Sequence, residues 1–159
     1  MATPTARIIV VSDRIHSGER KDSATPTARS LLIDAGFQVT SCVVVPEGEA
    51  AVAKALDEAC ATDTSLILTC GGTGLGPTNL TPEVSLTHIS TRLHGVETNI
   101  LIEGLQHSER AGLCRGVVGL TSREPGGSLI VNAPSSRGGI RDTLVVILRL
   151  WPSLTEWVG

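Results

Sequence analysis

The sequence contains almost no aromatic residues: Phe37, Trp151 and Trp157 are the only ones among 159. A protein that stacks bases or other flat ligands on aromatic rings does not fit this composition. The core therefore has to be built from Val, Leu, Ile and Ala, and a flat ligand has to be held by backbone and aliphatic groups.

An excess of positive charge and a long apolar run are also missing. Lys and Arg number 13 against 16 Asp and Glu, which gives a net charge of −3 and excludes the positive field that nucleic acids require. No stretch approaches the ~20 apolar residues of a membrane span, and the first residues lack a signal-peptide pattern. We expect a soluble, cytoplasmic protein without nucleic acid or membrane as a partner.

Paired cysteines and catalytic histidine constellations are absent as well. The cysteines are Cys42, Cys60, Cys70 and Cys114, and the histidines are His16, His88, His94 and His107. No CxxC occurs, no histidine stands at metal-ligand spacing, and no histidine pairs with a nucleophile in the sequence. We expect reduced, mostly buried thiols and no catalytic triad.

What the chain does contain is an alternation of strand and helix patterns. With 41% hydrophobic and 18% charged residues, residues 1–159 are expected to form one domain. A continuous apolar run at 6–12 predicts a strand covered on both faces, and residues 37–45 and 65–70 predict a second and a third strand. A helix capped by Thr25 and ended by Gly36 follows the first run, and a second helix follows the next. This order predicts a mostly parallel α/β sheet.

The second half of the chain continues this pattern. Thr81, Pro82 and Glu83 predict a helix start with the Thr81 hydroxyl as cap. Residues 95–108 read as a helix, and 116–122 and 128–133 as two antiparallel strands. The next helix has one apolar stripe and is expected to stop at Pro152. In the helix at 95–108, the inward side chains are expected to be Ile100, Leu101 and Leu105.

Four polar loops are expected at the carboxyl ends of the strands, where ligands bind in open α/β sheets. They span residues 12–23, 46–49, 71–81 and 134–139. Three of them, at 12–23, 71–81 and 134–139, have two interpretations. The loop at 12–23 is a ligand-facing lid or a solvated loop, and "SSR" at 135–137 is a phosphate site or ordinary helix capping.

The glycine loop "GGTG" at 71–74 is the most distinctive of these. It is neither a Walker nor a Rossmann fingerprint. Gly71, Gly72 and Gly74 could present successive N–H groups to an anion, with Thr73 adding a hydroxyl. The alternative is a tight turn that packs a strand against its neighbour.

In order along the chain, "VSDR…GER.D", "GGTG…TPE" and "N.P.S..G.R..L" resemble the molybdenum-cofactor biosynthesis domain, in its single-domain MogA/MoaB branch. The resemblance implies a three-layer α/β/α sandwich, commonly a homotrimer, that binds the pterin dithiolene molybdopterin. It further implies that Mg-ATP is used to adenylylate the pterin phosphate with release of pyrophosphate. A partner protein would then insert the metal.

The resemblance also implies the site residues. Catalytic roles fall on Glu47, Asn79 and Asp13, and metal binding on Glu47 and Asn79. Nucleotide or molybdopterin binding falls on Ser12, Gly71, Gly72, Thr73, Gly74, Thr81, Pro82, Glu83, Pro134, Ser135, Ser136 and Arg137.

This chain departs from the family pattern at several of these positions. The family usually has Arg-Asp where Thr78-Asn79 stands and PGSP where "PSSR" begins at Pro134, and Glu47 takes the place of an Asp. Further differences are His94-Gly95 for Pro-Gly, and Cys114 for the Ser of an "LSR" element. An Asn offers Mg²⁺ a carbonyl oxygen but no charge, and Mg²⁺ prefers carboxylates.

Two functions therefore stay open. One is an adenylyltransferase in which Asp13 or Asp22 takes over metal binding, and the other is a non-catalytic paralogue that stores, delivers or scaffolds molybdopterin. A nucleotide pyrophosphatase is a third and weaker alternative. The apolar chain end around Trp151, Leu154 and Trp157 supports homo-oligomerisation.

Overall fold

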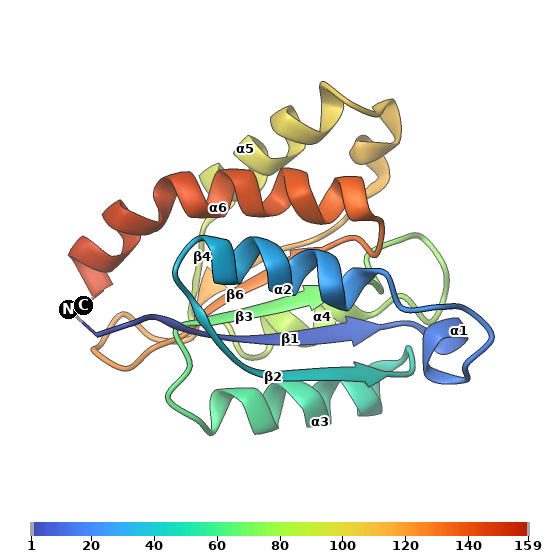
Figure 1. The fold of residues 1–159 in the computed structure, drawn as a ribbon, viewed down its shortest axis with the longest axis horizontal. Coiled ribbons are helices and arrows are strands. Elements are labelled where there is room, and N and C mark those ends of the chain that lie inside the picture. Colours follow the sequence, from blue (N-terminus) through green and yellow to red (C-terminus); the bar gives the residue numbers. More distant parts are fainter. Residues whose placement is uncertain (1, 159) are drawn as a thin grey trace.

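A computed structural model describes residues 2–158 and shows one six-stranded sheet in the order β2-β1-β3-β6-β5-β4 (Figure 1). The strands are β1 (Thr5–Val11), β2 (Gln38–Val45), β3 (Leu66–Cys70), β4 (Thr91–Arg92), β5 (Val118–Leu120) and β6 (Leu129–Ala133). β1, β2, β3 and β6 run parallel, whereas β5 is antiparallel to β6 and β4 to β5. The predicted, mostly parallel sheet with a late antiparallel part is confirmed.

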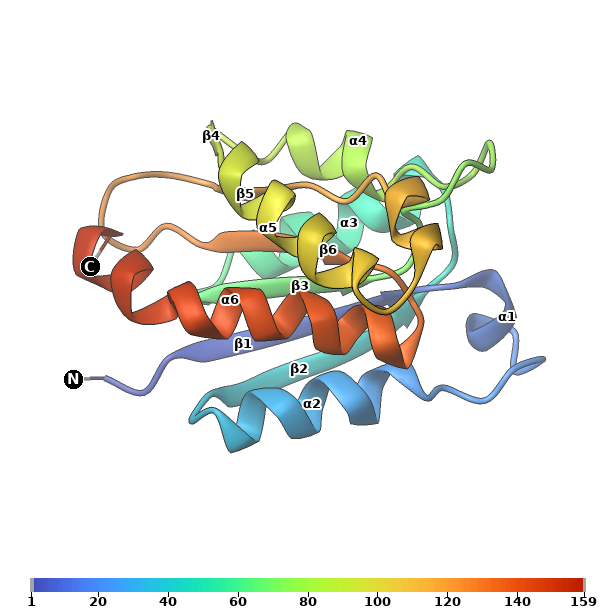
Figure 2. The same ribbon diagram turned by 90° about the horizontal axis from the view of Figure 1, so that it is seen from above.

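Helices cover both faces of this sheet, which gives the expected three-layer α/β/α sandwich (Figure 2). The helices are α1 (Asp13–His16), α2 (Ala24–Asp34), α3 (Glu49–Cys60), α4 (Thr81–Leu86), α5 (His94–Leu105), the 3-10 helix η1 (Glu109–Leu113) and α6 (Arg137–Val158). α2 and α6 lie on one face and α3 and α4 on the other, while α5 lies against α6.

The continuous apolar runs form the central strands because both of their faces are buried. In β1, Ile8 faces the cluster that α2 and α6 cover, whereas its neighbour Ile9 faces the cluster that α3 covers. Both side chains are at most 2% exposed. Because successive strand residues point to opposite faces, only an uninterrupted apolar run satisfies two covered faces.

Two helix starts differ from the prediction, while one helix end agrees with it. α2 begins at Ala24, and the Asp22 carboxylate accepts a hydrogen bond from the Thr25 N–H at 2.9 Å, so the prediction of Thr25 as cap was wrong. Thr81 is already inside the first turn of α4, and its buried hydroxyl caps nothing. Gly36 ends α2 as expected, with φ +94° and its N–H bonded to the Ile33 carbonyl at 3.0 Å.

Two further predictions concerning helices were wrong. On α5, Ile100 packs against the core, but Leu101 and Leu105 are 39% and 47% exposed, because only one side of this short helix meets α6. α6 continues through Pro152 to Val158. Pro152 lacks the N–H that would donate to the Leu148 carbonyl, and the Thr155 hydroxyl adds contacts one turn later, to the Trp151 and Pro152 carbonyls at 3.1 Å each.

Part of the apolar chain end is used within this chain. Trp151 packs edge-on against Phe37, with ring centroids 4.9 Å apart, and Leu154 packs on the same core. The side chain of Trp157 lies outside the described residues. Trp151 and Leu154 are therefore only partly exposed, because each also packs on the core of its own chain.

All four cysteines are free, as expected, but their burial differs. Cys70 is buried, and this burial raises the pKa of its thiol. Cys42 and Cys114 are exposed, so the expectation of mostly buried thiols was wrong for these two. Among the described residues, the helices are all too short or too polar to cross a bilayer.

Candidate ligand-binding site

The four predicted loops meet at one cleft at the carboxyl ends of β1, β2, β3 and β6. The cleft has a volume of about 1360 Å³, and its other wall comes from α5 and η1. Arg20 comes from the first loop, Glu47 from the second, Asn79 and the glycines from the third, and Ser135 from the fourth. Parallel strands bring these loops together because their carboxyl ends share one edge of the sheet.

Two glycines of the 71–74 loop are required by the backbone. Gly71 and Gly72 have φ values of +114° and +70°, which residues with a side chain rarely adopt. A Cβ on Gly71 would lie 2.1 Å from the Val11 carbonyl oxygen, and one on Gly72 would lie 2.1 Å from the Thr81 hydroxyl oxygen. The tight-turn interpretation thus holds for these two residues.

The same loop also leaves donors available. In the described part of the chain, none of the amides of residues 72–75 donates to a backbone or side-chain acceptor. The Thr73 hydroxyl, by contrast, accepts a hydrogen bond from the Cys114 thiol at 3.4 Å. Successive amides without a partner are the groups that bind anions, so the turn and the anion interpretations are compatible.

Arg115 holds this loop in place, a role that the sequence did not reveal. Its guanidinium donates to the Gly74 carbonyl at 2.8 Å, to the Asn79 carbonyl at 2.6 Å and to the Glu83 carboxylate at 2.6 Å. One side chain thereby ties both ends of the loop to α4. The "LSR"-like element marks this position, but the sequence alone does not show which residues, 32 or more positions away, Arg115 contacts.

The Arg115 hydrogen bond lowers the pKa of the Glu83 carboxyl below its ordinary value of 4.5. A carboxyl with a lowered folded-state pKa stabilises the fold above that ordinary value, and the contribution is lost as the pH falls through the folded-state pKa. We expect Glu83→Gln to destabilise the protein at pH 7, but by less than about 1 kcal/mol, since Glu83 is 51% exposed.

This difference should shrink as the pH falls from 5 toward 2. Urea unfolding of both proteins across that range measures it. A difference that grows at low pH would contradict the assignment.

Glu47 and Asn79 meet across the cleft. The Asn79 Nδ2 donates to Glu47 Oε1 at 2.8 Å, and the Thr78 hydroxyl donates to Oε2 at 3.3 Å. The Gly76 N–H donates to Asn79 Oδ1 at 3.1 Å, which fixes the amide orientation, because a flipped amide would set NH₂ against N–H and oxygen against carboxylate. The structure therefore brings these two predicted residues together as donor and acceptor.

These residues do not fit Mg²⁺. Mg²⁺ requires oxygen ligands in octahedral geometry, whereas Asn79 turns a nitrogen donor toward Glu47. Asp13 accepts from the Glu47 N–H at 2.9 Å, and Asp22 is engaged at the start of α2. Within residues 2–158, no group of three or more His, Cys, Asp or Glu is arranged to hold a metal ion.

The other predicted residues divide into two groups. Those that line the cleft are Gly71, Gly72, Thr73, Gly74, Pro134, Ser135 and Ser136. Those that do not line it are Ser12, Asp13, Thr81, Pro82, Glu83 and Arg137. The Ser12 hydroxyl caps α1 at 3.2 Å, and the Ser136 hydroxyl caps α6 by accepting from the Gly139 N–H at 3.1 Å. The capping interpretation is thus confirmed for Ser136.

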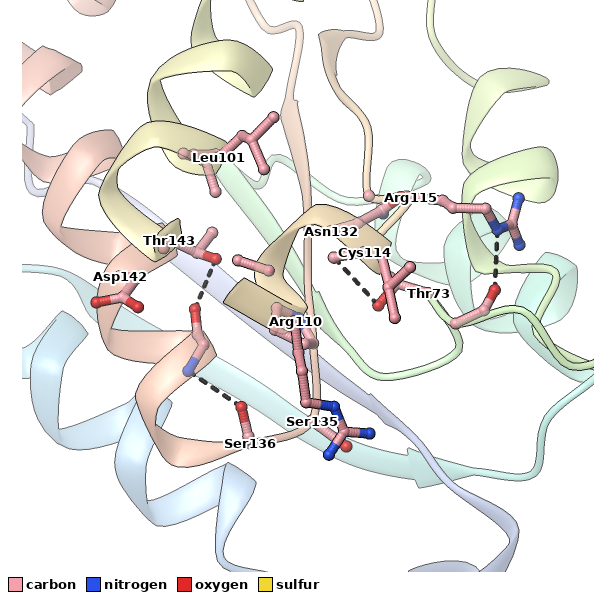
Figure 3. Close-up of a pocket in the computed structure, with 18 of the residues that line it drawn as sticks. Thr73, Leu101, Arg110, Cys114, Arg115, Asn132, Ser135, Ser136, Asp142 and Thr143 are labelled. Atoms are coloured by element: carbon pink, nitrogen blue, oxygen red, sulfur yellow. Dashed lines mark hydrogen bonds between the residues drawn. The ribbon is translucent and has the colours of Figure 1, made fainter. Parts of the chain in front are cut away.

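The cleft also contains charged residues to which no role was given. Arg20 and Arg110 line it, and within the described residues neither forms an ion pair. Figure 3 shows Arg110 on η1 extending toward Ser135. His107 and Asp142 pair at 3.0 Å on the same wall. Arg20 belongs to the quoted "GER.D" motif, whereas no pattern marked Arg110.

Asn132, the first residue of "N.P.S", lies at the floor of the cleft and hydrogen-bonds the elements around it. Its buried amide donates to the Thr69 hydroxyl at 2.9 Å and the Ser85 hydroxyl at 3.0 Å, and its oxygen accepts from the Val117 N–H at 3.1 Å. β3, α4, β6 and the residue that precedes β5 are thereby joined under the glycine loop. A fully satisfied buried network of this kind holds its elements in one arrangement.

The fold and the cleft define an α/β domain with a ligand-sized cleft at the carboxyl edge of its sheet. The sequence pattern of one family, described as "Probable molybdopterin binding domain", matches residues 7–155. The chain belongs to this molybdenum-cofactor biosynthesis family.

Similar proteins agree with this membership. A solved structure of a Corynebacterium diphtheriae protein assigned to molybdenum cofactor biosynthesis is 44% identical, with a TM-score of 0.91 and 98% of each chain covered. The Mog protein of molybdopterin biosynthesis from Mycobacterium ulcerans is 33% identical, with a TM-score of 0.88 over 98% of this chain and 99% of that one.

Among curated proteins, a molybdenum cofactor biosynthesis bifunctional protein of Chlorobaculum tepidum is 30% identical over 91% of this chain. The chain spans 45% of that relative's length and 26% of a molybdenum cofactor synthesis protein, cinnamon, of Drosophila melanogaster. These relatives are thus considerably longer proteins than the chain described here.

Proposed function

We propose that this chain binds molybdopterin in the cleft as part of molybdenum cofactor biosynthesis. The observation that carries the proposal is the row of amides at residues 72–75 that have no acceptor among residues 2–158, in a cleft that also holds Arg20 and Arg110. Amides and guanidinium groups are the donors that bind a phosphate group without covalent chemistry. Family membership supplies the ligand class.

The rest of the cleft suits the rest of this ligand. The wall formed by α5 and η1 contributes Ile100, Leu101 and Leu113, so an aliphatic surface is available for the pterin ring in a chain that lacks aromatics. The Ser135 hydroxyl and the Thr73 side chain add polar contacts on either side. The phosphate is thus assigned to the glycine loop and the ring system to the α5 side.

Binding is testable with molybdopterin released anaerobically from a denatured molybdoenzyme. We expect saturable binding by fluorescence or calorimetry, weakened about tenfold by Arg110→Ala, which corresponds to ~1.4 kcal/mol. The matched control is Arg149→Ala, because Arg149 pairs with Glu103 and does not line the cleft. An absence of saturable binding would overturn the proposed function.

A second candidate function is transfer of an adenylyl group from ATP to the bound pterin. The observation that favours it is the cleft volume of about 1360 Å³, since sites for one small ligand usually occupy about 300–1000 Å³. A phosphate oxygen of the pterin would attack the α-phosphorus of ATP, the bond to the β-phosphate oxygen would break, and pyrophosphate would leave. Because Glu47 and Asn79 do not fit Mg²⁺, no step is assigned to the metal of Mg-ATP.

Incubation with molybdopterin, ATP and Mg²⁺ separates the two candidates. Pyrophosphate and adenylylated pterin above the buffer level would support transfer. Binding without either product would leave the non-catalytic role, in which the chain stores or delivers the pterin.

Three expectations about assembly and location stay predictions. A homotrimer is one, and the exposed side chains of Ile102 and Leu105 on α5, outside the cleft, supply apolar surface for it. A protein partner for metal insertion and a location in the cytoplasm are the others. None of them is needed for the cleft to bind its ligand as proposed.

A further inference from the structure

The Glu47 carboxylate is satisfied by neutral donors of its own chain. Both oxygens accept hydrogen bonds, one from the Asn79 amide at 2.8 Å and one from the Thr78 hydroxyl at 3.3 Å. The Glu47 backbone N–H is held by Asp13 at 2.9 Å, so the residue is anchored at both ends. A cation at this carboxylate would have to displace at least one of these donors.

Asn79 cannot turn an oxygen to such a cation. Its oxygen accepts from the Gly76 N–H, and a Cβ on Gly74 would already lie 2.7 Å from that oxygen, so the loop encloses it closely. The Arg115 bond to the Asn79 carbonyl holds the backbone of the same residue. Rotation of the amide would cost the Gly76 bond and create two like contacts.

Positive charge is supplied to the cleft by arginine instead. Arg92, His107 and Arg115 are paired with carboxylates, but Arg20 and Arg110 have no such partner within residues 2–158. Arg20 and Arg110 therefore place two guanidinium groups in the same cleft as Glu47, none of the three forming an ion pair within residues 2–158. Guanidinium groups without a carboxylate partner suit a phosphate group that arrives without a cation.

We propose that this site takes its phosphate-bearing ligand without a divalent cation, and that Asn79 is the residue that decides this. The amide occupies the place beside Glu47 that a second carboxylate and a shared cation would need. The proposal rests on the proposed function only for the identity of the ligand. The cation preference itself follows from the contacts of Glu47 and Asn79.

Asn79→Asp tests this directly, because it sets two carboxylates at hydrogen-bond distance and removes the neutral donor. With Mn²⁺ alone as the probe at pH 8, electron paramagnetic resonance should show no site-bound Mn²⁺ for the native protein and stoichiometric binding for Asn79→Asp. Affinity should rise at least about tenfold and fall back in Glu47→Gln/Asn79→Asp. Ser135→Asp, which adds the same charge across the cleft, should bind no more Mn²⁺ than the native protein.

A second measurement needs no variant. Calorimetry of inorganic pyrophosphate with the native protein should give the same affinity, within about twofold, in Mg²⁺ and in EDTA. Stoichiometric Mn²⁺ binding by the native protein that Glu47→Gln abolishes would overturn the inference, and so would pyrophosphate binding that requires Mg²⁺. Because neither probe contains a pterin, failure to bind molybdopterin would overturn the proposed function and leave this result standing.

Discussion

Gly71→Ala is expected to destabilise the protein by about 3–4 kcal/mol and to abolish ligand binding in the cleft. The residue has a φ of +114°, and its new Cβ would lie 2.1 Å from the Val11 carbonyl oxygen, which belongs to a central strand and cannot move aside. Left-handed strain contributes about 1–2 kcal/mol, and the steric contact with backbone contributes the rest. Urea unfolding measures the loss of stability.

Gly112→Ala is the matched control for this substitution. Gly112 also lines the cleft, but its φ is not positive and a Cβ there would meet nothing within 4 Å. We expect a change within about 0.5 kcal/mol. Equal losses in the two variants would show that the cleft is generally intolerant of added volume, and the specific role assigned to the turn at Gly71 would be wrong.

Arg115→Met is expected to lower stability by about 2–3 kcal/mol and ligand affinity by tenfold or more. The substitution keeps most of the side-chain volume but leaves the part-buried carbonyls of Gly74 and Asn79 without their donors. The loop that carries the free amides would then lose its fixed geometry. Ligand affinity should therefore fall even though the Met side chain keeps most of the packing contacts. Thermal unfolding and ligand titration measure the two effects.

Glu83→Gln distinguishes the loop contacts from the surface ion pair. This variant removes the exposed charge partner of Arg115 but retains both bonds to the loop carbonyls, so ligand affinity should change less than about twofold. If Glu83→Gln weakened binding as much as Arg115→Met, the ion pair with α4, and not the two carbonyl contacts, would position the loop.

Local sequence patterns predicted much of the fold correctly. They gave wrong predictions where tertiary contacts override local preferences. The apolar segments correctly predicted β1, β2 and β3. In β1 and β3 the run is nearly continuous because both faces are covered, whereas β2 keeps polar and exposed positions at the edge of the sheet. Pro152 was expected to end α6, yet the helix continues, because the packing of Trp151 on Phe37 keeps this segment on the core. Leu101 and Leu105 were expected inside, since an apolar side chain does not itself reveal that only one side of α5 is covered.

By itself, the sequence determined the order of the longer strands and helices, the positions of the four polar loops and the presence of Asn at position 79, but not the short elements α1, β4 and η1. Apolar periodicity and glycine placement are local properties, so they can be recognised in the sequence alone. Only the tertiary structure decided that the Asn79 amide donates to Glu47, 32 residues earlier, and that Arg115 holds the loop carrying both the free amides and Asn79. These contacts depend on the register of parallel strands and on side-chain orientation, which no local pattern encodes.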